Sequence, residues 1–146
     1  MCVDLQFLGA RRGAITICPT VITVRDVITV AAVVASVLLA GLAVFQVLLV
    51  TGRPLGRLAW GGQHEVLPPS LRIGSAVSVV SYAVIAWVVW RAATEPEDDR
   101  PWMWVLTAFF GLGVAMNAAS RSRPERLLMT PIALVLAACS ALVAVG

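Results

Sequence analysis

The single histidine of the chain lies in a stretch suited to proton transfer or polar-ligand binding. His64 is flanked by Gln63 and Glu65. Histidine titrates near neutral pH, so beside a carboxylate it can shuttle protons or bind a metal ion. One histidine and one adjacent glutamate are too few for a closed metal site. We therefore expect no metal here, and the simpler interpretation of the stretch is a solvated or interfacial loop.

Other polar and aromatic residues are expected on the same side of the molecule as this loop. The full set of candidate ligand-binding residues is Trp60, His64, Glu65, Arg72, Asn117 and Arg126. Guanidinium groups next to a histidine and a carboxylate can bind an anionic lipid headgroup or a polar substrate. The residue types and spacings assign no catalytic residue and imply no cofactor.

These residues must be positioned by four long segments without charge. The segments are 27–50, 73–90, 102–119 and 127–145. A helix rises about 1.5 Å per residue, so about 20 residues cross a hydrocarbon core of about 30 Å. Open sheet edges cannot lie in lipid, and the strict alternation of a membrane barrel is missing. The sequence predicts an all-α integral membrane bundle of four transmembrane helices.

The overall composition agrees with a membrane protein. Hydrophobic residues make up 60% of the chain and charged residues 13%, against roughly 25% charged residues in soluble domains. Such a composition argues against a soluble enzyme and excludes a disordered chain. No run of basic residues indicates a nucleic-acid partner. The three cysteines, Cys2, Cys18 and Cys139, match no metal or disulfide spacing.

Residues 1–26 differ from the rest of the chain, and 27–146 is expected to be the transmembrane domain. Arg11, Arg12 and Pro19 interrupt the N-terminal stretch, and it lacks the pattern of a signal peptide. We expect a flexible extension. The alternative is an over-long gene start, with Val21 or Val24 as the initiator.

The three connections have different expected roles. Residues 51–72 form the longest one, and loops of this length are often functional. Residues 91–101 are expected to form an acidic, solvated loop. The connection at 120–126 is short enough to force the third and fourth segments into an antiparallel hairpin. Ser122 is expected to be the N-cap of the fourth helix, and Glu125 to face the positive end of its dipole.

Arginine counts bear on the orientation in the membrane. The first and third connections carry six: Arg53, Arg57, Arg72, Arg121, Arg123 and Arg126. The opposite side carries five: Arg11, Arg12, Arg25, Arg91 and Arg100. Six against five does not decide the orientation by the positive-inside rule. Without the N-terminal extension the count is six against three, which favours the first and third connections in the cytoplasm.

The four segments contain no ionisable Asp, Glu, Lys, Arg or His, which disfavours ion-coupled transport. Gln46 in the first segment is expected to form a hydrogen bond between helices. Gly111, Ala115 and Ala119 recur every four positions, and such small residues let helices approach closely. We predict that they face another helix.

Two stretches of the chain resemble a group of small, uncharacterised bacterial integral membrane proteins. The first comprises Gly52, Trp60-Gly61-Gly62, Leu67, Leu71-Arg72-Ile73 and Ser75. The second comprises Asn117, Ser120-Arg121-Ser122, Glu125-Arg126 and Pro131-Ile132-Ala133. The resemblance implies a four-helix unit from about Val27 onward, and it implies no activity.

Two functions are therefore open. The first is a non-catalytic, multi-pass protein of the cell membrane, acting as a partner subunit or a lipid-interacting protein. Its partners would be membrane lipids, another membrane protein or a second copy of the chain. The second is a small membrane-embedded enzyme or hydrophobic-ligand-binding protein with an interfacial site around the His64 loop. Convergence of the candidate residues over a cavity between helices would favour the second.

Overall fold

The computed structural model describes residues 23–146, apart from the side chains of residues 96–99. The elements in chain order are α1 (Val24–Val50), the short 3-10 turns η1 (Gly56–Leu58) and η2 (Trp60–Gly62), α2 (Pro69–Thr94), α3 (Pro96–Ala118) and α4 (Arg123–Val145). The described residues form no strand. Four helices are long and apolar enough to cross a membrane, which confirms the predicted all-α membrane bundle.

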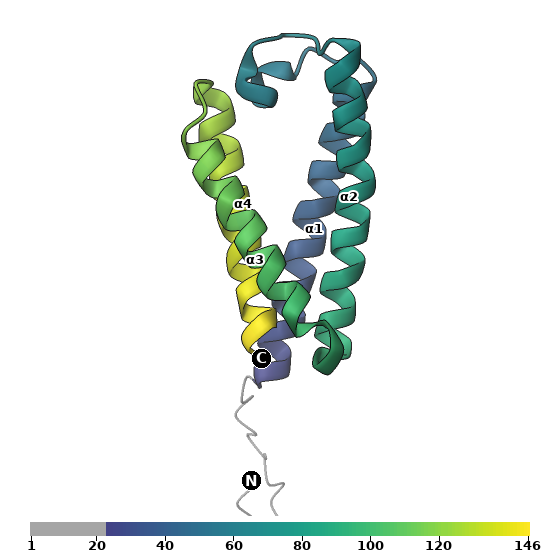
Figure 1. Ribbon diagram of the computed structural model, residues 1–146, viewed down its shortest axis with the longest axis vertical. Helices are drawn as coiled ribbons and strands as arrows, with labels where there is room; N and C mark the ends of the chain where they lie inside the picture. The colour runs from purple at the N-terminus through teal and green to yellow at the C-terminus, as the bar shows by residue number, and fades with distance from the viewer. Residues whose placement is uncertain (1–22) are drawn as a thin grey trace, which may run out of the picture.

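The helices pack as two antiparallel hairpins, α1 with α2 and α3 with α4 (Figure 1). The hairpins converge near the α2–α3 turn and diverge toward the end that carries the 51–68 connection. The converging half holds the main core. Its largest side chains are at most 1% exposed: Leu39, Val89, Met103, Leu136 and Val143. The core therefore closes one end of the bundle and leaves the other to be closed by the loop.

The outer faces of the helices are apolar and exposed, as a lipid-facing surface requires. Large exposed side chains occur on every helix, for example Val37, Val80, Val105 and Leu134. Exposed tryptophans gather at the α2–α3 end, where their amphipathic rings suit the headgroup level. These are Trp87, Trp90, Trp102 and Trp104.

The predicted loop at 91–101 is wrong, because helix continues through most of it. Helix α2 runs to Thr94 and α3 begins at Pro96, so that Glu95 alone separates them. Proline has a fixed φ and no N–H, which suits the first turn of a helix. Arg91 also pairs with Glu95 one turn later, at 3.8 Å between Nη2 and Oε2. Helix geometry is therefore retained beyond the apolar segments.

The N-terminal extension expected at 1–26 falls mostly outside the described residues. Its last three residues, 24–26, form the first turn of α1. The turn begins with a capping box: the hydroxyl of Thr23 accepts from the backbone N–H of Asp26, and the backbone N–H of Thr23 donates to the Asp26 carboxylate. Each partner satisfies a donor that the helix itself leaves unpaired.

The stripe Gly111, Ala115 and Ala119 does not face another helix of this chain, contrary to the prediction. All three residues are exposed, and a Cβ added at Gly111 would meet nothing within 4 Å. Helix α3 instead buries Met103 and Phe110 on its inner side. Bulky side chains thus make the inner contacts of α3, and the small residues lie on its outer surface.

Candidate functional site

The 51–68 connection bridges the two hairpins at their open end (Figure 1). The indole N–H of Trp60 donates to Oγ of Ser75 on α2, at 3.2 Å. On the other hairpin, the backbone N–H of Gly61 donates to Oε1 of Glu125, at 3.3 Å. The hydroxyl of Ser122 donates to the carbonyl of Arg57, at 2.6 Å. The loop is therefore bonded to both hairpins and covers the space between them.

The backbone of this cover adopts an unusual conformation. Trp60, Gly61 and Gly62 all have positive φ, at 55°, 78° and 67°. Glycine adopts such angles freely, whereas a bulky residue there is a genuine outlier that costs about 1–3 kcal/mol. At Gly62 an added Cβ would lie 2.6 Å from Oγ of Ser122. The turn is thus shaped to press the loop onto α4 and to direct the Trp60 side chain toward α2.

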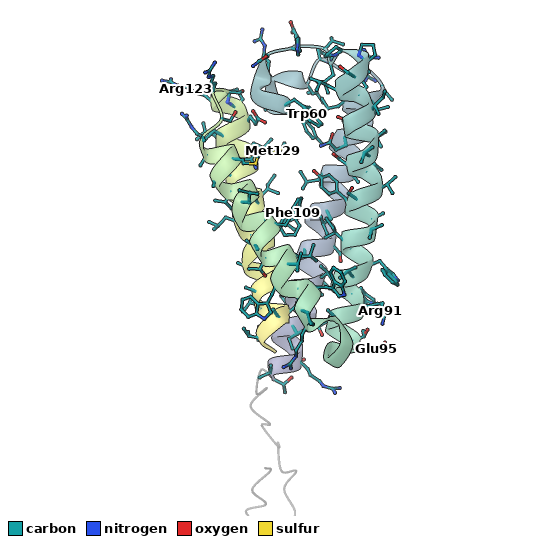
Figure 2. The ribbon with its side chains drawn as sticks, viewed as in Figure 1. Trp60, Arg91, Glu95, Phe109, Arg123 and Met129 are labelled. Atoms are coloured by element: carbon teal, nitrogen blue, oxygen red, sulfur yellow. The ribbon has the colours of Figure 1, made fainter. Side chains whose placement is uncertain are left out.

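A cavity of about 410 Å³ lies between the hairpins beneath this cover. Its size is within the range of about 300–1,000 Å³ that is typical of small-molecule sites. Figure 2 shows Phe109 and Met129 pointing into the space between the hairpins, with Trp60 above them. All four helices supply apolar lining residues, among them Leu42, Tyr82, Phe109, Met129, Ile132 and Leu136.

Part of the cavity wall on α3 is also exposed. Phe109, Leu112 and Met116 line the cavity and are also more than half exposed. The opposite wall comes from α2, at Ser78 and Tyr82. The cavity wall formed by α3 is therefore partly exposed.

Polar groups occupy only the loop end of the cavity lining, apart from the α2 hydroxyls. Gln46 lies near the end of α1, Asn117 near the end of α3 and Glu125 in the first turn of α4. Glu125 is 7% exposed. Its two oxygens accept from the Gly61 N–H and from the hydroxyl of Ser120, the latter at 2.5 Å. The lining is therefore amphipathic, with polar groups at the loop end and mostly apolar side chains below.

Two of the sequence-predicted residues, Trp60 and Asn117, line this cavity. His64 lines a wider hollow of about 750 Å³ on the loop face. That hollow shares Trp60, Met116, Asn117 and Glu125 with the cavity, so these four residues form the boundary between the two spaces.

The other three predicted residues lie elsewhere and make local contacts. Glu65 is exposed and lies 4.0 Å from Arg57, as measured between Oε2 and Nη2. The Nε–H of Arg72 donates to the carbonyl of Leu67 at 2.8 Å. Arg126 donates from Nη1 to the carbonyl of Ser120 at 3.5 Å. The candidate residues therefore do not converge as one set over the cavity.

Gln46 and Glu125 are two polar lining residues that the sequence did not single out as site residues. Gln46 was expected to bond another helix, and Glu125 to face the helix dipole. The sequence does contain one indication of a role for Gln46. Its amide lies within a long apolar segment, where burial of a polar group is costly. Ser122 is confirmed as the N-cap of α4, because its hydroxyl accepts from the Glu125 N–H at 3.5 Å. The cap is a local feature, so it could not predict that the Glu125 carboxylate contacts Gly61 in the distant loop.

Among the described side chains, no group of three or more His, Cys, Asp or Glu residues is placed to hold a metal ion. No protein family, curated protein or solved structure matches the chain.

Proposed function

We propose that this chain is a non-catalytic, multi-pass protein of the cell membrane that binds one lipid molecule between its two helical hairpins. The observation that carries the proposal is the cavity of about 410 Å³, apolar below and polar at the loop end. A lipid has the same division, with its apolar chain in the membrane and its polar head at the surface. The partly exposed α3 wall is where we expect a lipid to enter from the bilayer.

A lipid fits this space better than a helix of a partner protein. A spanning helix needs a groove that runs through the whole hydrocarbon core, about 30 Å. Here the loop residues Leu58, Ala59 and Trp60 line one end of the cavity. The converging helices, with Val89 and Met103 buried between them, close the other end. A flexible chain can fold into such a blind space, whereas a rigid helix cannot cross it.

The polar groups of the lining favour binding over catalysis. Glu125 is the single carboxylate among the described lining residues, and two donors already hold it. The histidine that would supply a general base, His64, lies in the neighbouring hollow and not in the cavity. The arrangement thus resembles a binding site more than a catalytic site, in which a nucleophile and a base would be in contact.

Two glycines on the same helix offer a matched test. Gly113 lines the cavity, and a Cβ added there would meet only Ala133 Cβ, at 3.9 Å. Gly113→Leu should therefore fill the cavity without a backbone clash. Gly111→Leu places the same side chain on the exposed surface of α3, where nothing lies within 4 Å. Both substitutions remove a helix-interior glycine and should raise helix propensity by a similar amount, about 1 kcal/mol.

The measurement is native mass spectrometry of the purified protein, counting lipid retained per chain. Wild type and Gly111→Leu should each retain about one lipid. Gly113→Leu should retain at least about tenfold less, which corresponds to a loss of about 1.4 kcal/mol in affinity. A wild-type protein without bound lipid, or equal retention by both variants, would overturn the proposal.

A further inference from the structure

Gln46 is a polar side chain without a partner in the wall of the lipid cavity. It is 8% exposed, and its Oε1 has no hydrogen-bond partner among the described residues. It lies about 6 Å below the end of α1, at 1.5 Å per residue, at the level where the lining changes from polar to apolar. An unsatisfied buried acceptor costs about 1–3 kcal/mol, and a ligand in the cavity that Gln46 lines could remove this cost by donating a hydrogen bond.

The neighbouring polar groups do not supply this hydrogen bond. The hydroxyl of Ser78 donates to the carbonyl of Gly74 at 3.0 Å. The indole N–H of Trp60 is bonded to Ser75, and the hydroxyl of Ser120 to Glu125. These three donors are thus already engaged within the fold, and Asn117, which also lines this end, leaves Oε1 of Gln46 without a partner.

We propose that Gln46 recognises the hydroxyl group of the bound lipid, an inference that rests on the proposed lipid-binding function. A hydroxyl both donates and accepts, and the terminal torsion of glutamine is broad, so the amide can present either its oxygen or its nitrogen to the cavity. The apolar chain of the ligand then fills the lower cavity beside Phe109 and Leu136.

The carboxylate at the loop end of the cavity disfavours acidic ligands. The buried Glu125 carboxylate lines the same end of the cavity, and a fatty-acid carboxylate or a phosphate there would be repelled by it. A charge buried beside a neutral amide also loses its hydration without compensation. A neutral alcohol, such as the free hydroxyl of a long-chain alcohol or of a diacylglycerol, avoids both costs.

The test is a competition between 1-dodecanol and dodecyl methyl ether, which have the same alkyl chain but differ in the hydroxyl donor. Wild-type protein is delipidated, mixed with equal amounts of both, and bound ligand is counted by native mass spectrometry. We expect wild type to prefer the alcohol about three- to tenfold, the ratio that one net hydrogen bond supplies. Gln46→Met, which keeps the length of the side chain, should bring the ratio to about one.

Gln63→Met is the matched control, because Gln63 is exposed in the loop and its loss should leave the preference unchanged. Gln46→Met removes an unpaired polar group, so the variant should fold at least as well as wild type. Equal binding of alcohol and ether by wild type would overturn the role of Gln46 and leave lipid binding intact, whereas binding of neither would overturn the proposed function. In a second competition, dodecylamine is offered together with 1-dodecanol. If wild type and Gln46→Met both preferred the amine, recognition would be assigned to Glu125 instead.

Discussion

Glu125 connects two parts of the chain that are far apart in sequence. Its carboxylate accepts from Gly61 in the loop and from Ser120 in the α3–α4 turn, and its own N–H is capped by Ser122. Hydrogen bonds to a charged group contribute about 1.5–3 kcal/mol, more than neutral ones. Glu125 thus fastens the cover of the cavity to α4, next to the bond from the Ser122 hydroxyl to the carbonyl of Arg57.

At the residue scale we predict that Glu125→Ala loosens this cover. The loop would lose its side-chain bond to α4, and trypsin should cleave after the exposed Arg57 faster than in wild type. The free energy of unfolding should fall by about 1–3 kcal/mol. Glu65→Ala is the control, since its pairing with Arg57 is exposed on both sides and contributes at most about 1 kcal/mol. Equal cleavage rates for both variants would contradict this role of Glu125.

At the scale of elements, α2 carries a glycine where the cover touches it. A Cβ added at Gly74 would lie 2.7 Å from Cη2 of Trp60. The indole therefore lies against the backbone of α2, where it reaches Ser75 in the next position. Helix propensity favours alanine over glycine by about 1 kcal/mol, but contact with the loop requires the smaller residue.

We predict that Gly74→Ala displaces the Trp60 ring and breaks its bond to Ser75. The loss of this part-buried bond, about 0.5–1.5 kcal/mol, should cancel the gain in helix propensity. Gly41→Ala on α1 meets nothing within 4 Å and should keep the full gain. Acrylamide quenching of Trp60, in a background with the other four tryptophans replaced by Phe, should rise for Gly74→Ala only. Unchanged quenching would show that the ring tolerates the methyl group.

At the scale of the whole molecule, the two membrane faces carry opposite charge. The loop face holds six arginines and two glutamates, Glu65 and Glu125. Within residues 23–146, the face at the α2–α3 turn holds three arginines, at 25, 91 and 100, and five acidic residues, at 26, 95, 97, 98 and 99; Arg11, Arg12 and Asp4 precede this range. Arginine-rich connections remain in the cytoplasm during insertion, and anionic lipids of the inner leaflet attract them.

We predict that the loop face is cytoplasmic. In a variant whose three native cysteines are replaced by Ser, Gln63→Cys reports on the loop face and Thr94→Cys on the opposite one; both positions are exposed. A membrane-impermeant maleimide applied to intact cells should label only the cysteine at position 94. Both positions should react after lysis, which controls for intrinsic reactivity. Labelling at position 63 alone in intact cells would reverse the orientation.

The number and type of the spanning elements follow from the amino-acid sequence. An uncharged run such as 27–50 is stable in lipid only as a helix, because every backbone N–H and C=O must be paired within the segment. The cap at Ser122 is equally local, since a side chain and a nearby N–H suffice to form it. The limits of α2 and α3 were less predictable, because polar residues at the headgroup level permit either a loop or a continued helix.

The tertiary structure alone decided which side chains surround the cavity. Gln46, Trp60, Asn117 and Glu125 come together from two helical hairpins and the loop that covers them. Glu125 and Gly61 are separated by 64 positions in the sequence. They meet because the loop lies between the diverging ends of the two hairpins. In lipid, helix association depends on close packing and on bonds between helices rather than on a hydrophobic drive. The inward face of each helix therefore follows from contacts between distant residues, which hydrophobicity along the chain does not encode.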